Sequence, residues 1–385
     1  MRKRIDRDRP VIALITNHDD DVYCFRKELI VGMRKAGFHV LISCPYGEKL
    51  ELMRNIRFKH DDVVIDRRGT NPVSDIRLLL HYRRMLCQYR PDVVLTYTSK
   101  PNVYASLAAA SLGIPYINNV TGLGSVLGMG KGMQSFILLL FKLAFWKSGC
   151  VFFQNEENMK LALKQGLVHG EYQLIPGSGV NTDRFPLQDY PGGGNGIEGE
   201  TIVFNYIGRV LHDKGVDDYI EAAKRIRRKY PKTEFNILGF IEPTEGHYEE
   251  ELKALGEQGI VIYRGQQKDV RPFIERAHAI IHPSTYGEGM SNVLLENASS
   301  GRVLITTDNP GCRETVQDGI TGFLYHGSDV DALTARIEGF LALDNETRRD
   351  MGLRGRAYVK ENFSREIVVE AYMEQIRKFT DEREE

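Results

Sequence analysis

Apolar and polar positions alternate along the chain with two different periods. Short apolar runs, such as residues 11–16 and 93–97, are typical of buried strands, whereas residues 25–35 place apolar side chains at helical spacing. Strand and helix patterns follow one another in this way through the first half of the chain. Repeated strand–helix–strand units predict an α/β fold, in which helices cover both faces of a parallel sheet.

This alternation is interrupted once and then starts again. Residues 191–196 read Pro-Gly-Gly-Gly-Asn-Gly, a composition that favours a linker. We therefore predict an N-terminal domain over residues 1–187, a linker over 188–200 and a second domain over 201–365, each with a doubly wound parallel sheet. Residues 366–385 are predicted to form a final amphipathic helix, and the sequence leaves open whether it crosses back to the first domain.

Composition and charge exclude several classes of protein. The net charge of −1, from 51 Lys and Arg against 52 Asp and Glu, argues against a nucleic-acid partner held by phosphate attraction. The five cysteines lie far apart without a C-x-x-C pair, which excludes a zinc ribbon and a disulfide scaffold. No secretory signal is visible, and the longest apolar run, residues 136–146, is shorter than the roughly 20 residues that span a bilayer. We expect a cytoplasmic protein.

Two cations follow the first strand of the second half. Residues 201–207 lead into Gly208 and Arg209, and Lys214 and Gly215 come just before the next helix. Glycine lets the backbone approach a ligand closely, and a helix start offers free N–H groups. Arginine grips phosphate with a planar fork and lysine acts as a point charge, so the pair suits a diphosphate. The alternative is a strand-to-helix turn with solvated surface charges.

Two glutamates, Glu288 and Glu296, are separated by seven residues. Glu288 falls in a glycine-containing loop after the strand predicted at residues 279–283, and Glu296 falls inside the next helix. Carboxylates accept hydrogen bonds from neighbouring hydroxyls, which favours a sugar or a ribose as the ligand. The alternative is a helix capped by Ser291 or Asn292, with Glu296 on the surface.

Taken together, the cation pair and the Glu-x7-Glu spacing resemble the retaining GT-B glycosyltransferases of family GT4. Residues 177–185 are similar to the N-G-V-D-x-x-x-F turn of that family, and the resemblance covers nearly the whole chain. It implies two Rossmann-like domains facing across a cleft. It further implies transfer of a sugar from a nucleotide donor without a metal or a cofactor, in which the acceptor hydroxyl passes its proton to the leaving phosphate.

The resemblance also implies roles for individual residues. Arg209 and Lys214 would bind the diphosphate and stabilise the leaving group, Glu288 would contact the donor sugar, and Glu296 would hold the ribose hydroxyls. The loop at residues 265–270 would cradle the base. The positions implied in donor binding are Gly208, Gly215, Gly265, Gly289, Met290, Ser291, Asn292, Val293 and Glu296, with the backbone N–H groups of residues 289–292 assisting Glu288.

Motifs of the first half narrow the implied acceptor. Residues 98–104 and 117–124 resemble bacterial transferases that extend a sugar-diphospho-undecaprenol, nearest to N-acetylgalactosaminyltransferases acting on bacillosamine. A UDP-N-acetylhexosamine donor and a polyprenyl-diphosphate-linked acceptor are therefore expected. The candidate acceptor residues are Tyr23, Arg26, Arg67, Lys100 and Thr121, and for the cations the alternative is a surface charge. The chain departs from the family at residues 17–21, and His18 there is interpreted as a turn residue.

Residues 131–147 allow two interpretations. An apolar helix flanked by Lys131 and Lys147 suits insertion into an anionic membrane surface, and it equally suits a core helix of the first domain. A membrane-bound acceptor favours a peripheral protein on the inner face of the cell membrane.

Three other functions compete with the transferase. The first is an NAD-dependent dehydrogenase, because the stretch from Thr121 to Gly128 imitates a dinucleotide-binding fingerprint. Its third glycine is misplaced and no acidic residue follows at the right distance, which argues against this function. A UDP-sugar 2-epimerase of the same fold and a non-catalytic nucleotide-sugar-binding protein remain as alternatives. For the transferase, we expect Glu296→Ala or Lys214→Ala to lower transfer sharply with little loss of folding.

Overall fold

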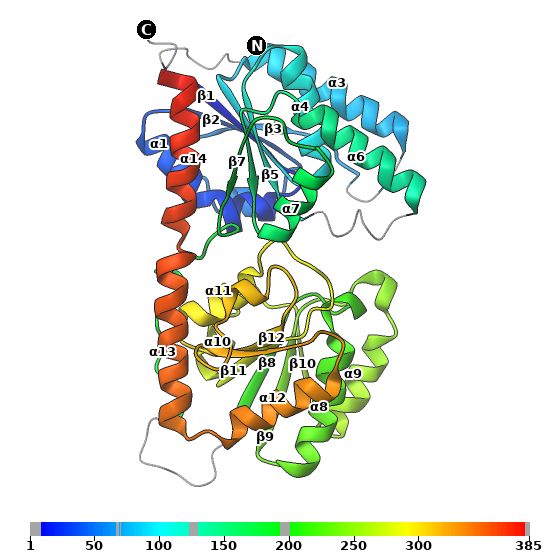
Figure 1. Ribbon diagram of the computed structural model, residues 1–385, viewed down its shortest axis with the longest axis vertical. Coiled ribbons are helices and arrows are strands. Elements are labelled where there is room, and N and C mark those ends of the chain that lie inside the picture. The colour runs from blue at the N-terminus through cyan, green and yellow to red at the C-terminus, as the bar shows by residue number, and fades with distance from the viewer. Residues whose placement is uncertain (1–8, 67–68, 70, 123–129, 193–200, 382–385) are drawn as a thin grey trace. The chain divides into compact units, whose positions relative to one another are not determined.

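The computed structural model describes residues 9–66, 69, 71–122, 130–192 and 201–381. The chain divides into two compact units, one of residues 1–178 with 365–385 and one of residues 179–364 (Figure 1). Each unit contains one parallel sheet covered by helices, which is the predicted fold class.

The first unit is built on seven parallel strands in the order β3-β2-β1-β4-β5-β6-β7. The order reverses between β1 and β4, so the loops after these two strands leave the sheet in opposite directions. A doubly wound sheet binds ligands at this kind of position. The strands are β1 Val11–Ile15, β2 His39–Cys44, β3 Lys59–Asp62, β4 Val93–Tyr97, β5 Tyr116–Val120, β6 Cys150–Phe153 and β7 Glu171–Leu174.

Alternate residues of β1 pack against different helices. Ile12 and Leu14 lie in one core cluster with residues of α1 and α14, whereas Val11 and Ala13 lie in another with residues of α3 and α4. Helices therefore cover both faces of the sheet (Figure 1). The helices are η1 Asp21–Arg26 (a π-helix), α1 Lys27–Lys35, α2 Glu48–Glu51, α3 Pro72–Tyr89, α4 Ser99–Ser111, α6 Lys131–Phe145, α7 Glu156–Lys164 and α14 Arg365–Thr380.

The second unit repeats this topology with six parallel strands in the order β10-β9-β8-β11-β12-β13. Its strands are β8 Ile202–Ile207, β9 Thr233–Leu238, β10 Ile262–Gly265, β11 Ala279–His282, β12 Val303–Thr307 and β13 Gly322–Tyr325. Its α-helices are α8 Val216–Lys229, α9 Tyr248–Glu257, α10 Arg271–Arg276, α11 Asn292–Ser299, α12 Val330–Ala342 and α13 Asn345–Asn362, with short 3-10 helices η2 His212–Lys214, η3 Pro243–Glu245 and η4 Arg313–Thr315.

The boundary between the units differs from the predicted one at residue 187. The second unit already begins at Gly179, because the segment that follows packs on this unit. The Tyr190 hydroxyl donates to the carbonyl of His278, and Ser299 donates to the carbonyl of Phe185. Residues 188–192 of the predicted linker therefore belong to the second unit, and residues 193–200 lie outside the described residues. The final helix α14 is grouped with the first unit.

Residues 63–65 are a short apolar run of the kind that predicts a strand, but the third strand of the sheet lies just before them. The structure places β3 at Lys59–Asp62, a polar segment at the edge of the sheet. An edge strand has one partner and partial exposure, so it does not require the apolar residues by which the sequence pattern identified strands.

Candidate active site

The principal candidate residues lie where the strand order of the second sheet reverses. β8 pairs with β11 in parallel, and these are the strands on either side of the reversal. Gly208 and Arg209 directly follow β8, and His282 is the last residue of β11. Ligands of doubly wound folds bind at the carboxyl ends of strands at such a point. The two predicted motifs therefore follow adjacent strands, although 73 positions separate Gly215, the end of the first, from Glu288, the start of the second.

The loop after β8 is held close to β11 by Gly215. This residue has φ of 70°, and a Cβ atom there would lie 1.9 Å from the carbonyl oxygen of Pro283. Only glycine fits both the backbone conformation and the contact. In addition, the amide of Thr285 donates to the carbonyl of Asp213 at 3.2 Å. These contacts bring Lys214, the last residue of η2, to the loop that carries Glu288.

The centre of the site is a group of three side chains, Lys214, Glu288 and His282, here called the triplet. Lys214 Nζ donates to Glu288 Oε1 at 2.6 Å, and His282 Nε2 lies 3.0 Å from the same oxygen. The side chains of Lys214 and Glu288 are 14% and 16% exposed. Burial by itself would raise the pKa of Glu288, but Lys214 and His282 together hold that pKa well below its usual range. Glu288 is therefore a carboxylate, and His282 donates to it through Nε2–H.

Potential metal ligands also meet here. One ligand atom each of His282, Glu288 and Cys312 lie within 4.8 Å of one another. Burial, followed by the Glu288 charge, raises the pKa of the Cys312 thiol well above its usual range, so the thiol is protonated. The Lys214 ammonium already binds the shared carboxylate oxygen, and a cation at this position would have to displace it. The chemistry of the cluster thus favours an anionic ligand beside Lys214.

Arg209 lies in the same loop as Lys214, two residues after the end of β8. Its Nη1 donates to Oε1 of Glu242 at 2.7 Å, and its side chain is 44% exposed. A guanidinium has five donors, so most of the fork is available to a ligand while Glu242 orients it. Gly265, implied in base binding, ends β10, two strands away from β8.

Helix α11 places the second motif, with one correction. The amide of Ser291 donates to the carbonyl of Gly311 at 2.8 Å, and its hydroxyl lies 3.3 Å from His282 Nε2. Ser291 is buried, so its N–H group is not available to a ligand as the resemblance implied. The Met290 side chain likewise packs in the core. Asn292 and Val293 begin α11 and, like Glu296 one turn later, are partly exposed.

The described candidate acceptor residues of the first unit come from three places: Tyr23 and Arg26 from η1, Lys100 from α4 and Thr121 from the segment after β5. Arg26 is only 4% exposed, its guanidinium lies 4.1 Å from the Tyr97 ring centroid, and it donates to Ser178 Oγ at 3.1 Å. This placement corrects the inferred role of Arg26 as a ligand of a lipid diphosphate, because the guanidinium is enclosed. Lys100 donates to Asp75 at 2.7 Å, and Lys27 and Lys49 flank the Tyr23 ring.

The two remaining acceptor candidates of the first unit are Thr121 and Arg67. Thr121 follows β5 and is partly exposed, and Arg67 lies outside the described residues. Near them, Thr98 at the end of β4 has φ of 66° and ψ of 163°, a region that residues other than glycine rarely occupy. This strain lies at the reversal of the first sheet, where a ligand of the first unit is expected.

Sequence reasoning did not identify His282 or Glu242. A signal for His282 existed, since a polar residue lay in the last two positions of the strand predicted just before the glycine-containing loop. Glu242 follows β9 and is separated by 33 residues from its partner Arg209, so no spacing rule links them.

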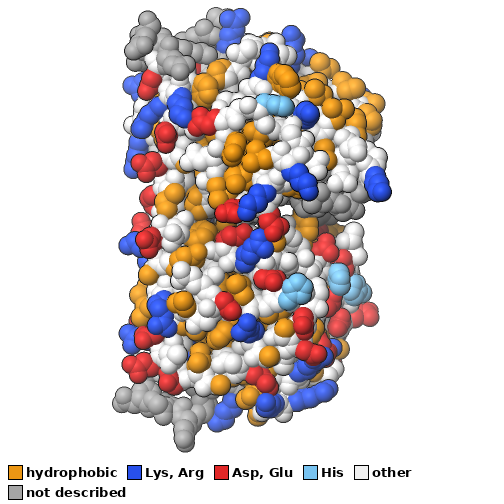
Figure 2. Space-filling view, in the orientation of Figure 1, with side chains coloured by type: hydrophobic (Ala, Val, Ile, Leu, Met, Phe, Trp, Pro, Cys, Tyr) orange, Lys and Arg blue, Asp and Glu red, His pale blue; other side chains and the backbone are white. Residues whose placement is uncertain are grey.

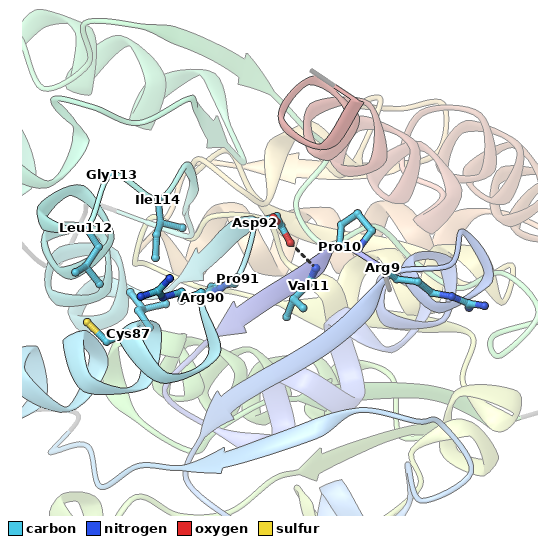
Figure 3. A pocket seen from close by; sticks show the side chains of 11 residues that line it. Arg9, Pro10, Val11, Cys87, Arg90, Pro91, Asp92, Leu112, Gly113 and Ile114 are labelled. Atoms are coloured by element: carbon cyan, nitrogen blue, oxygen red, sulfur yellow. Dashed lines mark hydrogen bonds between the residues drawn. The ribbon is translucent and has the colours of Figure 1, made fainter. Parts of the chain in front are cut away.

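A pocket of about 610 Å³ lies elsewhere, at the amino ends of β1 and β4 (Figure 3). Its lining includes Cys87, Arg90 and Asp92, and Asp92 accepts a hydrogen bond from the amide of Val11 at 2.7 Å. Ligands of doubly wound folds usually bind at the carboxyl ends of the strands, and this pocket lies at the amino ends.

Comparisons with known proteins agree with this geometry. A family model described as "Glycosyl transferases group 1" matches residues 193–358, and one described as "Glycosyl transferase 4-like" matches residues 11–155. The chain belongs to the GT4 family of glycosyltransferases. The two matches together cover every named strand except β7.

Individual relatives extend over most of the GT4 chain. It is 25% identical over 364 residues to the capsular polysaccharide biosynthesis glycosyltransferase CapM of Staphylococcus aureus, covering 91% of this chain and 93% of CapM. It is 24% identical over 374 residues to the N,N'-diacetylbacillosaminyl-diphospho-undecaprenol alpha-1,3-N-acetylgalactosaminyltransferase of Campylobacter jejuni, covering 94% and 97%. The structure of Anabaena HepE in complex with UDP and glucose superposes with a TM-score of 0.78 at 15% identity, covering 96% of this chain and all 100% of HepE, which supports the GT-B fold.

Proposed function

We propose that this glycosyltransferase moves an N-acetylhexosamine, GalNAc or GlcNAc, from a UDP-sugar to a polyprenyl-diphosphate-linked saccharide with retention of the anomeric configuration. The reaction would serve capsule, O-antigen or glycan biosynthesis at the cytoplasmic face of the cell membrane. The observation that carries the donor half is the triplet of Lys214, Glu288 and His282 at the reversal of the second sheet, where Arg209 follows β8. The name of the Campylobacter enzyme supports the acceptor class, and the name of CapM supports a role in capsule biosynthesis.

The charges of this site suit departure of a nucleoside diphosphate. When the bond between the anomeric carbon and the phosphate oxygen breaks, its electron pair stays on that oxygen, and negative charge grows on the diphosphate. Lys214 and Arg209 would stabilise this charge, as preorganised cations do in phosphoryl chemistry. They would replace the divalent metal ion that other sites use for the same purpose, so we propose a metal-independent reaction.

The carboxylates would act on the sugar and the ribose. Glu288 is ionised and carries a second oxygen in addition to the one that Lys214 and His282 share. That carboxylate would accept hydrogen bonds from donor hydroxyls, and Glu296 on α11 would accept from the ribose. In the proposed step the acceptor oxygen bonds to the anomeric carbon on the face from which the phosphate leaves, and the acceptor proton passes to the leaving phosphate oxygen.

A radiolabel transfer assay tests the proposal. Membrane extract rich in diphospho-undecaprenol-linked sugars is incubated with the protein and a panel of labelled UDP-sugars, with EDTA present. Label from a UDP-N-acetylhexosamine should move into the lipid phase, and loss of this label in Lys214→Met would connect transfer to the described site. Absence of transfer from every donor, both with EDTA and without it, would refute the proposed function.

The same reactions distinguish the alternatives. Conversion of UDP-GlcNAc to its 2-epimer, without label in lipid, would identify an epimerase. Thermal protection by UDP-sugars, without either reaction, would identify a nucleotide-sugar-binding protein. Label that moves only when EDTA is omitted would refute metal independence alone.

A further inference from the structure

Within residues 131–147 the structure forms α6, which has one side in the core and the other side exposed. Phe141, Ala144 and Phe145 of α6 are buried in a core cluster of the first unit. The opposite face exposes a continuous apolar stripe at helical spacing, with Phe136 at 55% and Trp146 at 60% exposure. We call the exposed residues Met133, Phe136, Leu139, Leu143 and Trp146 the α6 stripe. Among the described helices, none is long and apolar enough to cross a membrane.

A second stripe, which the sequence pattern did not identify, lies on α3. The side of this helix that faces the core consists of the buried residues Leu78, Tyr82, Met85 and Leu86. On the other side it exposes Val73, Ile76 and Leu80, of which Ile76 is 58% and Leu80 is 56% exposed. We call these three residues the α3 stripe. Single exposed apolar residues are common, but a helical row of large ones indicates a surface that is covered in function.

The two stripes belong to one layer of helices. α4 packs against α3 and against α6, and all three helices cover the same face of the first sheet (Figure 1). Both stripes lie opposite the buried side of their helix, so both face outward from this layer. Figure 2 shows hydrophobic side chains gathered over this upper right part of the first unit, with Lys and Arg side chains near them.

Charge identifies the kind of partner. Between residues 72 and 149 the sequence contains eight Lys and Arg but two Asp, although the whole chain has a net charge of −1. Both acidic groups are engaged inside the unit, Asp75 with Lys100 and Tyr104 and Asp92 with the amide of Val11. The exposed cations beside the stripes are Arg77, Arg83, Arg84, Lys131, Lys142 and Lys147.

We propose that α3 and α6 dock together on an anionic lipid bilayer, with both stripes in the acyl-chain boundary and the flanking cations at the headgroups. Apolar side chains bordered by lysine and arginine match the two zones of such a surface. A nucleic acid would use the cations and leave eight large apolar residues in water, so it fits less well. The inference deepens the proposed function, on which it rests for the presence of a membrane-bound acceptor.

The single tryptophan of the chain makes the α6 half directly measurable. Trp146 is the only tryptophan and belongs to the α6 stripe. With vesicles of equimolar phosphatidylglycerol and phosphatidylcholine, its emission should shift to the blue, and brominated acyl chains should quench it. With phosphatidylcholine alone the affinity should fall, because each cation near an anionic surface contributes about fivefold to binding.

The α3 half is tested by moving the reporter. In the variant Trp146→Phe/Leu80→Trp, the new indole should show the same blue shift and quenching. Trp146→Phe/Ile320→Trp is the matched control, since Ile320 is a 51% exposed residue of the second unit, and its indole should remain in water. The triple change of Arg77, Arg83 and Arg84 to Gln should weaken vesicle binding by roughly 100-fold.

The outcomes separate cleanly. A response of Trp146 without a response at position 80 would overturn the two-helix surface, and a response at neither position would overturn membrane docking. A blue shift that depends on protein concentration without vesicles would instead identify a second copy of the chain as the occupant. Docking is measured without donor or acceptor, so vesicle binding without sugar transfer would refute the proposed function and leave this surface intact.

Discussion

The ion pair between Lys214 and Glu288 allows a quantitative test of the candidate site. At 2.6 Å and an effective dielectric constant of about 20, the gross attraction is roughly 6 kcal/mol, much of which offsets desolvation of the two charges. Removing one partner of a buried pair costs about 3–5 kcal/mol, and the 14% and 16% exposure of these side chains places the expected cost at about 2–4 kcal/mol.

This magnitude revises one expectation drawn from the sequence. Lys214→Ala was expected to leave folding nearly unchanged, but it would remove the ammonium that contacts the buried Glu288 carboxylate, an oxygen of which His282 also contacts. Lys214→Met should therefore destabilise the second unit, whereas Glu296→Ala, at a partly exposed position, should not. Both changes should lower transfer, and Lys214→Met should do so by about 100- to 1000-fold, as loss of a preorganised charge-stabilising group does.

A double-mutant cycle supplies the assay. Lys214→Met, Glu288→Gln and the double variant are compared by hydrogen exchange of the peptides that contain β8 and β11, since tryptophan fluorescence would report the first unit. The two losses should not add, and a coupling of about 2 kcal/mol is expected. Lys229→Met is the control, because Lys229 forms a surface pair with Glu338 at 2.9 Å, which is worth less than about 1 kcal/mol. Additive losses would show that the pair is absent in solution, and unchanged turnover in Lys214→Met would refute the donor-site assignment.

Three further predictions concern the second unit. His282→Leu should lower kcat/KM by about 10- to 100-fold, which is the value of one hydrogen bond to a charged group, and His282→Gln should restore part of this loss. Equal activity of the wild type and the two variants would show that His282 does not orient Glu288. Gly215→Ala should destabilise the unit by more than about 1 kcal/mol in thermal unfolding, because its Cβ would meet the Pro283 carbonyl, and an unchanged melting temperature would contradict this contact. Burial, with nearby Arg348 and Arg302, lowers the pKa of His278 from 6.5 to about 4, so the unfolded chain binds more protons between these values and stability should fall by up to about 3 kcal/mol as pH drops from 6.5 to 4. His278→Gln should lose this acid dependence in denaturant titrations at several pH values, and a parallel decline in both proteins would assign it to other groups.

Much of the fold followed from local patterns. Strands such as β1 and β4 are short apolar runs because a parallel sheet buries both faces, and the sequence shows such runs without knowledge of their partners. The edge strand β3 was misplaced for the same reason, since a polar segment with one partner leaves no apolar signature. The domain boundary was missed because a glycine-rich composition predicts a linker but does not tell which unit the preceding segment joins. Contacts of Phe185 and Tyr190 decide that.

For the site, the sequence by itself determined the residue types: two cations after one strand and two carboxylates around a helix start, a combination that suits a sugar diphosphate. Only the tertiary structure decided which of them meet. Lys214 and Glu288 share one oxygen contact with His282 because β8 and β11 are neighbours in the sheet, although a long segment separates them in the chain. The α3 stripe is a similar case, since local hydrophobicity cannot tell an apolar residue that enters the core from one that faces outward. That distinction depends on which side of the helix the sheet and α4 already cover.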